Sequence, residues 1–273
     1  MIGLGTYAFL WEHSDRAPQP LSLVGAFERT RELGVDLFQI CDYAPLELMD
    51  DVELDDAAAA ARDLGLTIEV GTKGVAPERL TRFLELAAVF DARLVRSMIY
   101  APDSRPTLAQ AEAWLRGILP AYEAAGVSLA LETYEQVSTA DLTRLIATIG
   151  SPALGVCLDP ANVVARLELP RETVELAAPY VTNIHVKDFA FARQPGWVGF
   201  TFTGTRMGEG LHDYPHLLET VRPREREVNE RKVNEREVNE IVEHWLPWQG
   251  DAETTVRTER EWTRATLEYL RST

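Results

Sequence analysis

Two apolar runs of strand length, separated by a segment with helical spacing, constrain the fold of this chain most strongly. The two runs are Leu154–Leu158 and Val181–Ile184, and the segment between them, Ala161–Ala178, has enough Val, Leu and Ala for a crossover helix. A strand, a helix and a second strand of this size form a βαβ unit, in which the two strands run parallel. The sequence therefore predicts an α/β protein built on a parallel sheet.

The same alternation of strand and helix runs through the whole chain. The expected strands are Ile2–Phe9, Val35–Cys41, Leu66–Gly71, Ala92–Met98, Val127–Glu132, Leu154–Leu158, Val181–Ile184 and Ile241–Glu243. The expected helices are Leu21–Leu33, Asp51–Leu64, Pro77–Phe90, Thr107–Ala125, Thr139–Ile149, Ala161–Ala178 and Arg257–Leu270. A strand-then-helix unit that recurs mostly every ~25–35 residues predicts a (β/α)8 TIM barrel. A doubly wound open sheet is the alternative, but the early GLGTY run lacks the glycine pattern of a dinucleotide site.

Length, composition and charge favour one folded domain. The chain has 273 residues, 46% of them hydrophobic, and no linker interrupts the succession of strand-like runs. Met1 leads directly into a predicted strand, so we expect no signal peptide, and no apolar run approaches the ~20 residues of a membrane helix. The net charge of −16 would repel a nucleic-acid backbone. We expect a cytoplasmic protein with neither membrane nor nucleic-acid partners, and with Cys41 and Cys157 as buried free thiols.

One segment departs from the alternation of strands and helices. Residues 226–240 read REVNE, RKVNE and REVNE, three copies of a five-residue motif. A step of five residues places the three valines on no common face of a helix or a strand, so the repeat cannot build a core. Interspersed Glu and Arg favour a solvated helix. We predict one barrel domain over residues 1–273 with a charged surface insertion at about 224–240; a partner-binding helix is the alternative.

A carboxylate or an imidazole ends each of the four late strands. In chain order these side chains are Glu132, Asp159, His185 and Glu243. The carboxyl ends of barrel strands meet at one face, so we expect the four to converge there. Three converging carboxylates would repel one another without a cation, and oxygen-rich ligation with one nitrogen suits Mn²⁺, Mg²⁺ or Co²⁺. The sequence therefore predicts one divalent metal site, with His244 as an alternative to Glu243 that points the other way.

These motifs resemble those of the xylose-isomerase-like TIM barrels, in particular the sugar phosphate isomerase/epimerase group. The resemblance covers nearly the whole chain and rests on the order of IGLGTYAF, LALE, GVCLDPAN, NIHVKD, GEGLHDYP and IVEHWLP. It implies one divalent metal ion held by Glu132, Asp159, His185 and Glu243, with Glu132 and Glu243 also moving the substrate proton. The chemistry is consistent, because a cation that polarises a carbonyl stabilises the enediolate formed when a carboxylate removes the adjacent proton.

The chain departs from the family pattern at one position. Many sugar epimerases of this group have a His three residues after the aspartate of the sixth strand, where this chain has Asn162. An asparagine can hydrogen-bond a hydroxyl or a carboxylate but cannot carry a positive charge, which argues against simple ketose epimerisation. We therefore list Asn162 as a candidate substrate ligand rather than as a general acid.

Several cations at strand ends or in loops are further candidate substrate ligands. They are Lys73, Arg96, Lys187 and Arg206, which could bind a carboxylate or a phosphate, and surface salt bridges are the alternative for them. Arg206 belongs to a long loop, Phe189–Met207, that either covers the substrate or is a plain surface excursion. The GEG sequence that follows is interpreted as a tight turn beside the metal.

The combined features predict a divalent-metal-dependent isomerase or epimerase that acts on a small sugar, sugar phosphate or sugar acid through a metal-stabilised enediolate. A lyase with the same site is the alternative: a decarboxylase of a 3-oxo sugar acid, or a dehydratase. Related abasic-site endonucleases would need a basic groove and more metal ligands, which five histidines and a charge of −16 argue against. A non-catalytic barrel would be favoured by the loss of a ligand, and none is lost. The sequence leaves open whether the protein is a homo-oligomer.

Overall fold

The computed structural model describes residues 1–194, 196, 198–221 and 238–273. Most of the predicted charged insertion, up to residue 237, therefore lies outside the described residues. Its last two residues, Asn239 and Glu240, belong to a strand, which starts two residues earlier than the sequence indicated.

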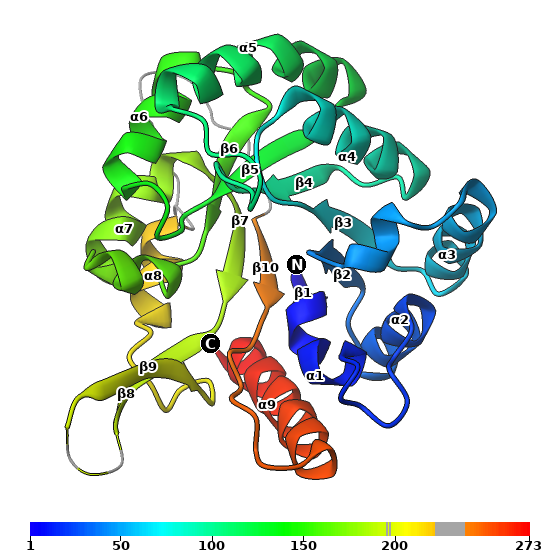
Figure 1. The fold of residues 1–273 in the computed structure, drawn as a ribbon, viewed down its shortest axis with the longest axis vertical. Coiled ribbons are helices and arrows are strands. Elements are labelled where there is room, and N and C mark those ends of the chain that lie inside the picture. Colours follow the sequence, from blue (N-terminus) through cyan, green and yellow to red (C-terminus); the bar gives the residue numbers. More distant parts are fainter. Residues whose placement is uncertain (195, 197, 222–237) are drawn as a thin grey trace. The chain divides into compact units, whose positions relative to one another are not determined.

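Eight strands form a closed barrel among the described residues, as predicted (Figure 1). They are β1 (Ile2–Gly5), β2 (Leu37–Cys41), β3 (Thr67–Gly71), β4 (Leu94–Ser97), β5 (Ser128–Glu132), β6 (Leu154–Leu158), β7 (Val181–Val186) and β10 (Asn239–Val242). Their order around the barrel is β1-β10-β7-β6-β5-β4-β3-β2. The pairs β1–β2, β3–β4, β4–β5, β5–β6 and β6–β7 are all parallel. The prediction of a (β/α)8 barrel is thus confirmed.

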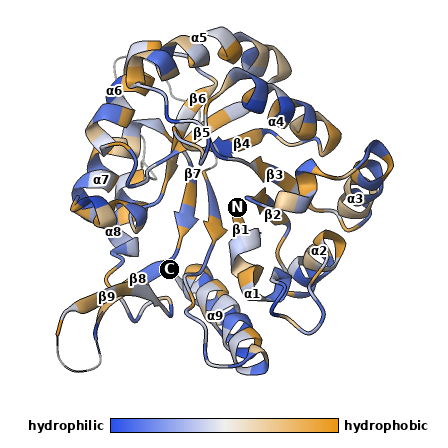
Figure 2. Cartoon of the chain, in the orientation of Figure 1, coloured by the Kyte–Doolittle hydropathy of each residue, from blue (hydrophilic) through white to orange (hydrophobic). Residues whose placement is uncertain are grey.

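The residues group into two compact units. The first consists of Met1, Glu69–Ile184 and Asp213–Glu240, and the second of Ile2–Ile68, His185–His212 and Ile241–Thr273. In both units the strands are largely apolar and the helices carry one apolar side, as the orange and blue colouring of Figure 2 shows. β2 and β6 are buried along their whole length, because strands covered by helices face no water on either side.

Among the residues that the structure describes, five helices belong to the first unit. They are α4 (Pro77–Val89), α5 (Leu108–Ala125), α6 (Thr139–Ile149), α7 (Pro170–Ala177) and α8 (Tyr214–Val221). The side chains of Thr107 and Ser138 cap the N-termini of α5 and α6, and glycines in the left-handed conformation end both helices. Each helix packs against the next along the chain, which covers the strands of this unit.

The predicted crossover helix Ala161–Ala178 is wrong in detail. It is divided into the 3-10 turn η3 (Asn162–Arg166), the helix α7 and the short turn η4 (Ala178–Tyr180). Leu167 has a positive φ of 66°, which ends η3, and Pro170 starts α7 because it cannot continue a preceding helix. The chain after Asp159 therefore turns tightly before the true crossover helix begins.

In its described part, the second unit has four helices, α1 (Leu10–His13), α2 (Leu23–Glu32), α3 (Asp51–Asp63) and α9 (Ala252–Ser272), and the 3-10 turns η1 (Thr6–Phe9) and η2 (Ala44–Glu47). The predicted first strand Ile2–Phe9 is too long, since η1 begins directly after Gly5. The last helix begins five residues before the predicted Arg257, because the Asp251 side chain accepts a hydrogen bond from the backbone N–H of Thr254.

The segment Phe189–Met207, predicted as a loop, is mostly a hairpin. β8 (Asp188–Arg193) and β9 (Phe200–Thr205) pair antiparallel and form the two-stranded ribbon labelled in Figure 1. Phe202 contacts both Phe189 and Phe191 across it, and also packs against Trp245. Aromatic residues at every second position were the signal for strand structure here.

Two further expectations can be compared with the described residues. Cys41 and Cys157 are both buried free thiols, as predicted. Among the helices of the part of the chain that the structure covers, none combines the length and the apolar character that crossing a bilayer requires.

Candidate functional site

Two carboxylates of the first unit are held side by side by one amide. Glu132 is the last residue of β5 and Asp159 follows β6 directly, and both are buried. The Asn162 side-chain nitrogen donates to Glu132 Oε1 at 2.6 Å and to Asp159 Oδ2 at 2.9 Å. Asp159 Oδ1 in turn accepts the backbone N–H groups of Ala161 and Asn162 at 2.9 and 3.1 Å. The tight turn between Asp159 and Asn162 therefore brings the Asn162 amide back to the two carboxylates.

Arg96 neutralises part of this negative charge. Its guanidinium forms a buried ion pair with Glu132, and Nη1 donates to the Thr72 carbonyl oxygen at 2.9 Å. Arg96 lies on β4 and Glu132 on β5, where the two strands pair in parallel register. The predicted substrate ligand is thus also a partner of a predicted metal ligand.

His185 and Glu243 form the corresponding group in the second unit. His185 Nδ1 lies 3.3 Å from Glu243 Oε1, and His185 Nε2 lies 2.8 Å from Gln39 Oε1. The Lys187 ammonium donates to Glu243 Oε2 at 2.8 Å and stands 4.7 Å from the centre of the Trp245 ring. All of these polar groups are buried, so charge, hydrogen bonding and a cation–π contact fix the Glu243 carboxylate.

His244 points away from this group, as its place one residue further along the chain predicts. Its Nε2 lies 3.1 Å from Thr263 Oγ1, and its ring packs edge-on against Trp262. Burial lowers the pKa of His244 to about 4, so the ring is neutral at physiological pH. Glu243, rather than His244, is the side chain directed at His185.

Asp188 organises the turn that follows the hairpin. Its Oδ1 accepts the backbone N–H groups of Phe189 and His212 at 2.8 and 3.0 Å, and its Oδ2 accepts those of Gly208 and Gly210, both at 2.9 Å. A Cβ on Gly210 would collide with the Asp188 carboxylate and the Phe189 carbonyl oxygen. The sequence analysis missed Asp188, although a carboxylate followed by a glycine-rich stretch was a usable signal.

The remaining predicted site residues occupy less central positions. Lys73 is partly buried just after β3. Arg206 is half-exposed and paired with Glu209 at 2.9 Å. Glu209 N donates to the Arg206 carbonyl oxygen at 3.0 Å, and Gly208 has a φ of 86°. The GEG stretch is therefore the tight turn that the sequence indicated.

The donor sets suit a hard divalent cation. The first unit offers two adjacent buried carboxylates, and the second an imidazole nitrogen next to a buried carboxylate oxygen. Three carboxylates and one imidazole match the ligands that Mg²⁺ and Mn²⁺ take in proteins, whereas no thiolate-rich set of the kind that selects soft metals is needed.

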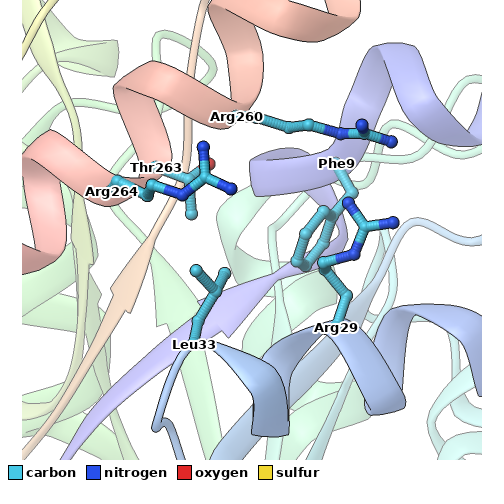
Figure 3. Close-up of a pocket in the computed structure, with 6 residues that line it drawn as sticks. All are labelled: Phe9, Arg29, Leu33, Arg260, Thr263 and Arg264. Carbon is cyan, nitrogen blue, oxygen red and sulfur yellow. The ribbon is translucent and has the colours of Figure 1, made fainter.

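A small cleft lies away from these residues, in the second unit. It is lined by Phe9, Arg29, Leu33, Arg260, Thr263 and Arg264, as Figure 3 shows. Arg29 and Arg260 both pair with the buried carboxylate of Glu12, at 3.3 and 2.6 Å. None of the predicted site residues lines this cleft, so we assign it a structural role.

Comparison with known proteins agrees with this fold. The family model described as xylose isomerase-like TIM barrel matches residues 27–266. The 3-oxo-isoapionate decarboxylase of Pectobacterium atrosepticum is 51% identical over 269 residues, covering 98% of this chain and 94% of that protein. A crystal structure of D-psicose 3-epimerase in the presence of D-fructose matches with a TM-score of 0.71 at 16% identity, covering 99% of this chain and 98% of the other.

A further structural match is to a protein crystallised with a metal ion. It is a xylose isomerase-like TIM barrel protein from Mycobacterium smegmatis in complex with magnesium, with a TM-score of 0.68 at 17% identity, covering 97% of this chain and 95% of that one. At such identities the structural matches establish the fold alone, whereas the family model spans most of the sequence. The protein therefore belongs to the xylose isomerase-like TIM barrel family.

Proposed function

We propose that this protein is a metal-dependent decarboxylase of a 3-oxo sugar acid, the lyase alternative of the sequence analysis. The observation that carries the proposal is the 51% identity, over 98% of the chain, to a 3-oxo-isoapionate decarboxylase. The proposed metal ligands are Glu132, Asp159, His185 and Glu243, and Mn²⁺, Mg²⁺ and Co²⁺ are the candidate ions. When bound, such a cation would stabilise the negative charge that develops on the substrate oxygens.

The ion pairs in the two units favour this reaction over isomerisation. Glu132 is paired with Arg96 and Glu243 with Lys187, so a carboxylate that removed a proton from carbon would do so in competition with its own ion pair. Loss of CO₂ does not require a carboxylate to remove a proton from carbon, because the electron pair of the enediolate comes from the C–C bond that breaks. Buried cations also suit a substrate that carries a carboxylate.

The residues can then be assigned roles. In a 3-oxo acid the C–C bond to the carboxylate breaks, CO₂ leaves, and the bonding electron pair becomes an enediolate. One proton must then be added to the carbon that lost CO₂. We assign this delivery to the Lys187 ammonium, which Glu243 holds by a hydrogen bond and which regains its proton from solvent, while Glu132, fixed by Asn162 and Arg96, orients the substrate hydroxyls. Lys73 and Arg206 are proposed to contact the outer part of the substrate.

Isotope incorporation tests this assignment. Mn²⁺-loaded protein is incubated in D₂O with 3-oxo sugar acids, ketoses and sugar phosphates, and the products are analysed by mass spectrometry and NMR. We expect the parent to release CO₂ and to place one deuterium on the neighbouring carbon. Glu243→Gln should lose this activity. Glu78→Gln, the control at an exposed residue at the start of α4, should keep it. Deuterium exchange without CO₂ release would contradict the decarboxylase proposal and would indicate an isomerase or epimerase. If no substrate is turned over, both the decarboxylase and the isomerase or epimerase are contradicted.

A further inference from the structure

We infer that Gln39 is a positioning residue for the proposed metal site, because its side-chain carbonyl oxygen holds the His185 ring with Nδ1 presented as the ligand atom. The inference deepens the proposed function and rests on it for the identity of the site. Gln39 lies in the middle of β2, in the otherwise apolar run LFQIC, and is 0% exposed. It was not among the residues singled out from the sequence.

A buried amide inside an apolar strand needs a specific reason. Burying an amide without hydrogen bonds is unfavourable, because the amide loses its bonds to water and gains none in return. Gln39 Oε1 lies 2.8 Å from His185 Nε2, within hydrogen-bond distance. His185 is itself 0% exposed, and its ring nitrogens can therefore bond only with protein groups or with a ligand at the site.

The acceptor oxygen decides which ring nitrogen carries the proton. A carbonyl oxygen can only accept, so the contact to Gln39 Oε1 requires a proton on Nε2. Nδ1 is then available to a metal ion on the side of the ring where Glu243 Oε1 lies, 3.3 Å away. If the Gln39 amide were turned so that its NH₂ group faced the ring, Nε2 would have to accept and the proton would move to Nδ1, which would block ligation there.

Lys187 completes the arrangement from the opposite side. It donates to Glu243 Oε2, which leaves Oε1 directed at His185 Nδ1. Gln39 thus sets the ring and Lys187 sets the carboxylate, so that His185 Nδ1 and Glu243 Oε1 face each other at 3.3 Å. Removing a side chain that hydrogen-bonds a metal ligand in this way typically weakens metal binding about 10–100-fold.

The test measures the ring proton and the metal affinity separately. In metal-free protein with ¹⁵N-labelled histidine, the His185 signals are identified by their loss in His185→Asn, and we expect Nε2 to be protonated. Mn²⁺ affinity is measured from the EPR signal of the free ion. We expect about 10–100-fold weaker binding in Gln39→Met, which keeps the shape but removes the acceptor, and near-parental binding in Gln39→Glu, which restores it.

Gln136→Met is the matched control. Gln136 is a part-buried glutamine of the first unit whose Oε1 accepts the Tyr100 backbone N–H at 2.8 Å, and its loss should leave both readouts unchanged. An unprotonated Nε2 in the parent protein would overturn the inference, even if Gln39→Met does not fold. Parental Mn²⁺ affinity in a folded Gln39→Met would overturn it as well. If the parent binds no Mn²⁺ but Nε2 is protonated, the positioning of the ring stands and the metal site of the proposed function fails.

Discussion

Arg96 and Glu132 form an ion pair that is almost completely withdrawn from water, with side-chain exposures of 3% and 1%. Lys187 and Glu243 form a second such pair, with 4% exposure on each side. Two separate carboxylates with proposed roles in proton transfer or metal binding are thus each neutralised by a cation from a preceding strand end. Because two opposite charges are buried together, neither can be removed without leaving the other uncompensated.

The Arg96–Glu132 pair leads to a prediction about stability. In Arg96→Met the Glu132 carboxylate stays buried without its partner, and we expect the free energy of unfolding to fall by about 3–5 kcal/mol. Urea denaturation at pH 7 measures the change. Arg93→Met is the matched control, since Arg93 forms a surface pair with Asp91 in which the two side chains are 69% and 82% exposed; its effect should stay below about 1 kcal/mol. Equal effects of the two substitutions would contradict the burial argument.

Asp188 should stabilise its turn through its charge. Asp188→Asn keeps one acceptor oxygen but replaces the other with an NH₂ group that faces backbone donors, and hydrogen bonds to a charged group contribute about 1.5–3 kcal/mol each. We expect the backbone amides of Gly208 and Gly210 to exchange with solvent faster, as measured by hydrogen–deuterium exchange. Asp213→Asn, at an exposed ion pair with Arg171, should not alter exchange in this turn. Unchanged protection in Asp188→Asn would show that the turn is held by its backbone alone.

Glu259 predicts a pH dependence of stability in the second unit. Burial, and to a smaller degree the nearby Glu12 carboxylate, raise the pKa of Glu259 from 4.5 to about 8, although the backbone N–H groups of Trp11 and Glu12 oppose the shift. The folded state therefore favours the protonated form. The stabilisation that comes from the protonated Glu259 side chain is complete below pH 4.5 and is lost as the pH rises to about 8.

Replacing Glu259 tests this sign. Glu259→Gln cannot ionise, so its stability relative to the parent should rise between pH 5 and pH 8.5 by up to about 4 kcal/mol. Thermal unfolding of both proteins across this range gives the difference curve. Glu261→Gln, an exposed change on the same helix, should give a flat difference. A Glu259→Gln protein that loses stability relative to the parent on raising the pH would refute the assignment.

Metal binding should appear as thermal stabilisation. A ligand that binds only the folded state adds about 2.7 kcal/mol at a concentration 100 times its dissociation constant. We expect Mn²⁺ to raise the melting temperature of the parent and of Glu219→Gln, a surface control, but not of Asp159→Asn. The shift caused by the metal is compared within each protein, so that differences in intrinsic stability cancel. An equal shift in Asp159→Asn would place the bound ion elsewhere.

The sequence was sufficient to predict the barrel, because each strand is a short apolar run and each helix has a stop or a cap that can be identified locally. Gly126 and Gly150 end their helices at the expected positions. The predictions failed where local patterns compete. The Val and Ala content of Ala161–Ala178 resembled one long helix, but the positive φ at Leu167 and the Pro170 start of α7 divide it.

The sequence predicted which residues belong to the candidate site but not which side chains form hydrogen bonds or ion pairs with them. Strand ends indicated Glu132, Asp159, His185 and Glu243, since each of them ends or follows an apolar run of strand length. Their partners are remote in sequence, however: Gln39 and His185 are separated by 146 positions. Nothing in the local sequence indicates that an amide on one strand faces an imidazole on another. The same limitation applies to Asn162, whose hydrogen bonds to two carboxylates depend on a turn that was predicted as a helix.

The boundary between β7 and the hairpin has a consequence for how proteins with this arrangement can diverge. β7 ends at Val186 and β8 begins at Asp188, so a single residue, Lys187, connects them. An insertion or deletion here would shift Lys187 by one position relative to His185 and would move Asp188 away from the four amides that it binds. The far end of the hairpin has no such constraint. A change in the length of the connection between β8 and β9 would leave His185, Lys187 and Asp188 in place, so these proteins can vary in length there without disturbing the three residues.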